Sequence, residues 1–259
     1  MTAKQSLLAF LFAACLAQGA FLAPVIANMK GVNRRATGIL ALLILCFLPM
    51  IGEEFIEISG WTDRFPHTIA SSTALDYAIA PLLLLYAWTV TDRERRITRR
   101  DLLHFLPFCA ALLILLPFYL LSGEEKLRLA DAAWPISLRL VIAGKIVIGG
   151  VYLTLVIRYL LRFVNQTERS AARDPNVVWL LRAMASVAVM AGATIVMALL
   201  PAAGVETPID SDALGTLVIC GSIYLISFLL IRHPLSAAAA AGVPITQLVV
   251  PGPLRARYQ

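Results

Sequence analysis

The chain has 259 residues, of which 59% are hydrophobic and only 15% are charged, and its mean hydropathy is +0.80. Soluble domains are about half apolar and a quarter charged, so this composition excludes an ordinary water-soluble protein. The net charge of +6 lies mostly in short segments between apolar stretches, which disfavours a nucleic-acid-binding surface. The four cysteines, Cys15, Cys46, Cys109 and Cys220, lie inside apolar stretches without ligand spacing and predict packing thiols.

Apolar stretches of about twenty residues, the length that crosses ~30 Å of hydrocarbon, recur along the chain. They are continuous rather than alternating, which favours helices, because a helix satisfies its own backbone hydrogen bonds in lipid. The sequence therefore predicts an all-α polytopic membrane protein with seven transmembrane helices within residues 1–233. In chain order the predicted spans are 6–26, 37–58, 74–90, 102–121, 138–164, 177–203 and 214–231.

The start of the chain has a second interpretation. Lys4 precedes an apolar stretch, and Cys15 follows two alanines, as in a signal peptide with a lipoprotein-type cysteine. However, the apolar stretch continues to Ile26, which favours an uncleaved span.

Basic and acidic residues alternate between the segments that join the spans. Arginines and lysines follow the first, third, fifth and seventh spans, whereas the other connections are rich in glutamate and aspartate. Basic residues mark the cytoplasmic side. The pattern predicts an N-terminus outside and a cytoplasmic C-terminus. The basic residues are Lys30, Arg34, Arg35, Arg93, Arg95, Arg96, Arg99, Arg100, Arg158, Arg162, Arg169, Arg173, Arg232, Arg255 and Arg257.

Residues 234–259 differ from the rest of the chain. An alanine tract, 237–241, is followed by prolines and glycines, which is typical of a linker. A segment of this length cannot bury a core of its own. We expect a cytoplasmic tail without a catalytic or DNA-reading module, and so no direct DNA contact from this chain.

Three carboxylates mark the outer end of the second predicted span. Glu53, Glu54 and Glu57 share one stripe of a helix, and Glu53 would lie about 24 Å from the cytoplasmic boundary. Charge at that depth is costly and usually functional. Two interpretations are open: these carboxylates serve a site inside the membrane, or helix tilt places them among the headgroups.

Lys145 is the conspicuous charge of the fifth predicted span, about 10 Å from its outer face. Glu53 would reach a similar depth, so we expect a Glu53–Lys145 ion pair across two helices. The pair is either structural or one wall of a ligand pocket, and Lys145 can also snorkel outward. Asp76 is a further pocket candidate. Tyr77, Trp61, His67 and Trp134 are at the same end, although interfacial aromatic belts also account for the tryptophans.

Enzymatic chemistry has little support in the residues. His67, His104 and His233 are far apart and lack metal-ligand spacing. There is neither a nucleophile elbow nor a glycine-rich phosphate loop. The sequence predicts no enzyme, no metal and no cofactor.

Four short motifs carry a family resemblance that spans about residues 5–258. They are RFPH at 64–67, APLLLLY at 80–86, LHFLPF at 103–108 and LPFYLLSGEEKL at 116–127. The chain resembles the N-terminal seven-helix membrane regions of bacterial AraC-type transcriptional regulators. In that family a cytoplasmic helix-turn-helix module follows the seventh helix, whereas this chain stops at Gln259, about where the module would begin.

The resemblance implies an inner-membrane, multi-pass sensory domain, the input half of a membrane-bound transcriptional regulator. Its partners would be the lipid bilayer and a small-molecule or envelope ligand on the outer side. Homodimerisation would suit a DNA-binding output, because such sites are commonly two-fold symmetric. The alternative is a small-solute transporter without an output domain, although the chain has no evident internal repeat.

Overall fold

The computed structural model describes residues 2–28, 34–92, 95–132, 134–166 and 213–225. This part of the chain is helical and contains no strand, which confirms the all-α prediction. The predicted sixth span, the end of the seventh and the tail at 234–259 lie outside the described residues.

The helices of the first two-thirds of the chain follow the predicted stretches closely. Four of them are long and apolar enough to cross a membrane: Ala3–Ala27, Arg34–Ile58, Asp101–Tyr119 and Ile136–Phe163. A shorter apolar helix, Ala213–Leu225, falls within the predicted seventh span. The elements are α1 (Ala3–Ala27), α2 (Arg34–Ile58), η1 (Pro66–Thr68), α3 (Asp76–Thr91), η2 (Asp101–Phe105), α4 (Leu106–Tyr119), α5 (Gly123–Ala132) and α6 (Ile136–Gln166).

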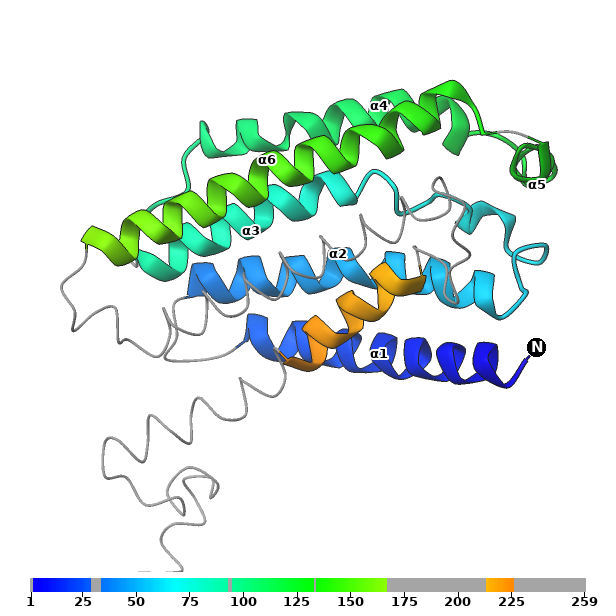
Figure 1. Ribbon diagram of the computed structural model, residues 1–259, viewed down its shortest axis with the longest axis horizontal. Coiled ribbons are helices and arrows are strands. Elements are labelled where there is room, and N and C mark those ends of the chain that lie inside the picture. The colour runs from blue at the N-terminus through cyan, green and yellow to red at the C-terminus, as the bar shows by residue number, and fades with distance from the viewer. Residues whose placement is uncertain (1, 29–33, 93–94, 133, 167–212, 226–259) are drawn as a thin grey trace, which may run out of the picture.

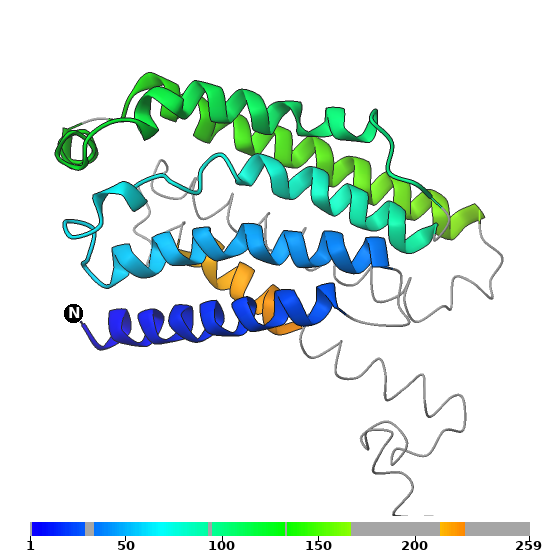
Figure 2. The same cartoon turned by 180° about the vertical axis from the view of Figure 1, so that it is seen from behind.

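Five helices lie side by side in the order α1, α2, α3, α6 and α4 (Figure 1). The opposite view shows the same order, with Ala213–Leu225 crossing α1 and α2 (Figure 2). Gly19 of α1 accounts for this close packing, because a Cβ there would lie 2.7 Å from Leu48 of α2 and 3.6 Å from Ile223. The thiols of Cys15 and Cys220 form a further contact between α1 and Ala213–Leu225.

The central helix α3 is buried on all sides. Its 16 residues pack against α2 and α6, and Leu82, Leu85 and Ala87 belong to the main hydrophobic core. The buried hydroxyl of Thr89 donates to the carbonyl oxygens of Leu85 and Tyr86, 3.0 and 3.1 Å away. A helix that is apolar all round is expected at the centre of such a bundle.

Large apolar side chains cover the outside of the bundle. Phe21 is 72% exposed, Phe10 70% and Leu113 69%. Large exposed apolar surfaces mark sites that contact another molecule or a membrane. Together with the four long apolar helices, this exterior is that of a membrane protein.

The helix α5 was not among the predicted elements. Ser122 and Glu125 form a capping box at its start: the Glu125 backbone N–H donates to the Ser122 Oγ, and the Ser122 N–H donates to the Glu125 carboxylate. The ammonium of Lys126 lies 5.4 Å from the centre of the Phe118 ring. These contacts attach α5 to the end of α4, at the same end of the bundle as η1 (Figure 1).

Candidate functional site

The predicted site residues come together at one end of the bundle. Here α2 and α4 end, and α3 and α6 begin. We call the polar side chains at this end the carboxylate cluster; its members are Glu53, Ser72, Asp76, Tyr119 and Lys145. They come from four helices and from the segment that precedes α3.

Lys145 forms an ion pair with Asp76 rather than with Glu53. The Lys145 Nζ lies 3.2 Å from an Asp76 carboxylate oxygen, and the Asp76 side chain is only 16% exposed. The prediction of a Glu53–Lys145 ion pair was therefore wrong: the acidic partner of Lys145 is Asp76. The reason is the helix order, because α3 packs between α2 and α6 and brings Asp76 to the lysine first.

Glu53 binds the segment that precedes α3. One oxygen of its carboxylate accepts hydrogen bonds from the Ser72 backbone N–H at 3.0 Å and from the Ser72 hydroxyl at 2.6 Å. The Ser71 hydroxyl lies 3.5 Å from the same oxygen. Each such hydrogen bond contributes on the order of 1 kcal/mol. Glu53 therefore anchors the approach to α3 on the end of α2.

A second link between α3 and α6 adjoins the ion pair. The hydroxyl of Tyr77 donates to the carbonyl oxygen of Val141 over 2.6 Å. Gly144 provides the space for that hydroxyl, since a Cβ at position 144 would lie 2.5 Å from it. Tyr77 therefore takes part in the site as a structural neighbour of Asp76.

Tyr119 is the unexpected member of the carboxylate cluster. Its hydroxyl oxygen is buried, and within the described part of the chain the hydroxyl makes no hydrogen bond of good geometry. The Ala74 backbone N–H is near enough to donate weakly to this oxygen, and Glu53 and Asp76 lie within electrostatic range, so what the hydroxyl lacks among the described residues is an acceptor. Buried polar groups are nearly always paired, so a hydroxyl without an acceptor beside two carboxylates calls for a ligand or water molecule.

The three glutamates predicted to share one stripe have different surroundings. Glu54 is buried, Glu53 is half-buried, and Glu57 is exposed. Trp61 packs edge-to-face on Phe55 rather than on the cluster.

The remaining candidates from the sequence lie on the η1 and α4 side. The Trp134 ring packs on that of Phe118, with 6.4 Å between their centres. His67 is exposed and belongs to η1, which contacts α5. These two residues join the same end of the bundle but not the carboxylate cluster.

The carboxylate cluster can bind a ligand through hydrogen bonds and charge. The described residues hold no group of three metal-ligating side chains. Ser72 and Tyr119 were missed in the sequence because a hydroxyl next to an apolar stretch carries no signal of its own. The one available hint was the closeness of Ser71 and Ser72 to Asp76 in the chain.

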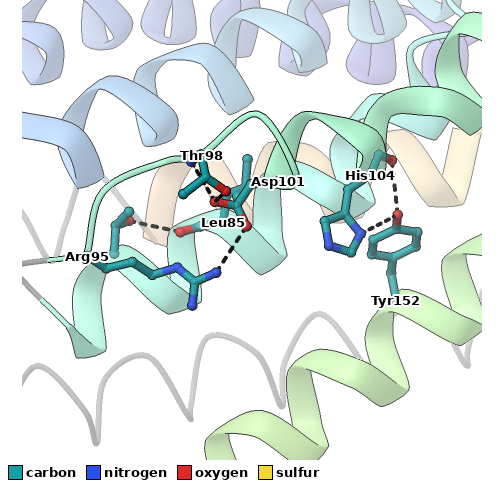
Figure 3. Close-up of polar contacts among 7 residues, drawn as sticks. Leu85, Arg95, Thr98, Asp101, His104 and Tyr152 are labelled. Atoms are coloured by element: carbon teal, nitrogen blue, oxygen red, sulfur yellow. Dashed lines mark hydrogen bonds and ion pairs between the residues drawn. The ribbon is translucent and has the colours of Figure 1, made fainter.

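A second polar cluster lies at the opposite end of α3, and no sequence pattern indicated it. The Asp101 carboxylate accepts hydrogen bonds from the Thr98 backbone N–H at 2.8 Å and from the Thr98 hydroxyl at 3.0 Å. It also pairs with Arg95 at 3.1 Å (Figure 3). The Arg95 guanidinium stacks on the Trp88 ring, 3.9 Å from its centre. These contacts hold the connection between α3 and α4 against the end of α3.

The second cluster continues onto α6. The Tyr152 hydroxyl donates to the backbone carbonyl of His104 at 3.0 Å, so the His104 Nδ1, also 3.0 Å away, donates to the Tyr152 oxygen (Figure 3). Tyr159 and Thr91 share a hydrogen bond of 2.7 Å. Polar groups therefore tie α3, η2 and α6 together at this end as well.

No protein-family model, curated protein or solved structure matches the chain. The resemblance to AraC-type membrane regions stays a hypothesis.

Proposed function

We propose that this chain is a sensory domain of the bacterial cytoplasmic membrane and the input half of a membrane-bound transcriptional regulator. In this proposal seven helices cross the membrane, with the N-terminus outside and the C-terminus in the cytoplasm. The carboxylate cluster then faces the outer side and receives a small polar ligand or an envelope signal.

The observation that supports the proposal is the buried hydroxyl of Tyr119 beside Glu53 and Asp76, for which the described residues supply no hydrogen-bond acceptor. A purely structural cluster would be expected to satisfy every buried polar atom. A ligand that donates a hydrogen bond to Glu53 and accepts one from Tyr119 would give the Tyr119 hydroxyl the acceptor that it lacks.

The cluster also has a route by which binding alters helix packing. Glu53 is on α2, Asp76 on α3, Tyr119 on α4 and Lys145 on α6, so a ligand between them contacts four helices at once. A ligand shifts a conformational equilibrium only by its difference in affinity for the two states. Competition for the bonds that Glu53 makes to Ser72 provides such a difference.

The test replaces cluster residues at the chromosomal locus of the full gene and measures the transcriptome. Glu53→Gln, Tyr119→Phe and Lys145→Met should each change transcript levels while the protein still inserts into the membrane. Glu124→Gln is the matched control, because Glu124 is an exposed carboxylate of α5 outside the cluster. Three inserted cluster variants with the wild-type transcriptome would overturn the proposal.

A flux assay separates the sensor from the alternative, a small-solute transporter. The purified chain is reconstituted into proteoliposomes, and uptake of a panel of radiolabelled small solutes is compared with that of empty vesicles. A sensor should transport none of them. Uptake that Tyr119→Phe or Lys145→Met abolishes would favour the transporter.

A further inference from the structure

Three arginines stand out in the connection between α3 and α4. Arg96, Arg99 and Arg100 are exposed, and within the described part of the chain none of their guanidinium groups makes a hydrogen bond, an ion pair or a ring contact. The neighbouring Arg95, in contrast, is occupied by Asp101 and Trp88. Three guanidinium groups within five residues are therefore free to bind an external anion.

The backbone that carries these arginines is held in place at several points. Asp101 binds the Thr98 backbone and hydroxyl (Figure 3). Arg95 stacks on Trp88. Arg35, at the start of α2, donates to the Arg95 carbonyl over 2.8 Å. A loop that is already ordered loses less conformational freedom on binding than a flexible loop does.

Exposed apolar side chains adjoin the three arginines. Leu102 and Leu103 are each 58% exposed, Leu106 is 60% exposed, and Ile97 is 42% exposed. These residues begin the stretch that continues into the apolar helix α4. Arginines next to exposed leucines at the end of a transmembrane helix are typical of the boundary between lipid headgroups and acyl chains, where the arginines contact the headgroups and the leucines contact the acyl chains.

We propose that residues 96–106 form a binding site for anionic phospholipids of the leaflet at this end of the bundle. Arg96, Arg99 and Arg100 bind the phosphate groups, because a guanidinium presents paired donors that match phosphate oxygens. Leu102, Leu103 and Leu106 contact the upper acyl chains of the same lipids. This site is independent of the carboxylate cluster and of the sensory function proposed above.

Binding at this site should depend on the charge of the lipid headgroup and on the three arginines. Each basic residue near an anionic surface strengthens binding by about fivefold. Replacing all three arginines should therefore weaken binding of an anionic lipid by more than tenfold while binding of a zwitterionic lipid stays the same.

The experiment uses the purified full chain in detergent, titrated with phosphatidylglycerol or phosphatidylcholine of equal chain length. Bound lipids are counted by native mass spectrometry. The test variant is Arg96→Gln/Arg99→Gln/Arg100→Gln. The matched control is Arg64→Gln/Arg128→Gln/Arg139→Gln, which removes three exposed arginines from the opposite end. Thermal melting of both variants confirms that they stay folded.

The expected result is tight, salt-sensitive binding of phosphatidylglycerol that the test variant loses and the control variant keeps. Arg96→Lys/Arg99→Lys/Arg100→Lys should retain part of the affinity, since it keeps the charge but loses the paired donors. Equal losses in the test and control variants would overturn the proposal, as would equal binding of the two lipids. Displacement of the lipid by inorganic phosphate alone would assign the site to free phosphate instead.

Discussion

A methyl group added at Gly144 tests the link between α3 and α6 next to the Asp76–Lys145 ion pair. The new Cβ would lie 2.5 Å from the Tyr77 hydroxyl oxygen, closer than side-chain atoms tolerate, and 3.7 Å from the Tyr77 Cζ, an ordinary contact. Gly144→Ala must therefore displace the hydroxyl from the Val141 carbonyl to which it donates. The new methyl group therefore clashes with the Tyr77 hydroxyl but not with the Tyr77 ring.

The magnitudes follow from that geometry. Over-packing a filled site costs about 1–3 kcal/mol, so we expect Gly144→Ala to lower the free energy of unfolding by about 2 kcal/mol. Tyr77→Phe loses one hydrogen bond and should cost about 1 kcal/mol. In the double variant Tyr77→Phe/Gly144→Ala the hydroxyl is absent, so the new methyl group at position 144 has no atom to clash with. The double variant should then be about as stable as Tyr77→Phe alone, which makes the coupling between the two sites about 2 kcal/mol.

The assay is equilibrium unfolding of the purified protein in detergent, titrated with a denaturing detergent and followed by tryptophan fluorescence. Gly149→Ala is the matched control, since it lies on the same helix and its Cβ meets no atom within 4 Å. It should leave stability unchanged or raise it slightly. An equal cost of Gly144→Ala with and without the Tyr77 hydroxyl would refute the reasoning.

Three further predictions concern other parts of the bundle. Burial lowers the pKa of Lys126 below its usual value near 10.5, so the unfolded chain binds this proton more tightly and stability should rise with pH between the two pKa values. Lys126→Met should abolish that rise in melting temperature, measured in steps of pH from neutral up to the usual lysine pKa near 10.5. Oxidation with a lipid-soluble copper complex should join Cys15 to Cys220, detected by mass spectrometry of disulfide-linked peptides. Asp101→Ala leaves donors of Thr98 and Arg95 without their acceptor and should cost about 2 kcal/mol in the same unfolding assay.

Each of these predictions has its own control. Arg128→Met removes an exposed charge from the same helix as Lys126 and should leave the pH profile unchanged. A disulfide between Cys15 and Cys46 in place of Cys220 would contradict the position of Ala213–Leu225 beside α1. For Asp101→Ala the comparison is Asp63→Ala, an exposed carboxylate whose removal should have no effect on stability.

The long helices were predictable because the free energy of placing a helix in lipid is a sum over its residues. For that reason Ala3–Ala27, Arg34–Ile58 and Ile136–Phe163 agree with the predicted stretches to within a few residues. A lysine in an apolar helix needs an acidic partner, so a partner for Lys145 was predictable from the sequence. Which residue it is depends on which helix lies next to α6, and that is not visible in the sequence.

The polar details were harder to predict because they depend on contacts distant in the chain. Nothing near Tyr119 in the sequence shows that its hydroxyl is buried beside Glu53 and Asp76. The helix α5 was missed although Ser122 and Glu125 have the spacing of a capping box, since a segment of 10 residues produces little periodic signal. In the sequence Arg95 is indistinguishable from the arginines next to it, and only the fold shows that its guanidinium group stacks on Trp88.

In the proposed seven-span arrangement α3 also crosses the membrane, and its shortness then has a consequence for the surrounding bilayer. Its 16 residues rise about 24 Å, whereas the hydrocarbon layer is ~30 Å thick. The polar groups at its two ends, Asp76 and Thr91, are therefore closer together than the two membrane surfaces. Thinning of the lipid around the bundle relieves this hydrophobic mismatch at a cost of a fraction of a kcal/mol per Å. Bilayer thickness thus acts on both ends of α3 at once, and shorter-chain lipids favour the arrangement in which both polar clusters reach the headgroups.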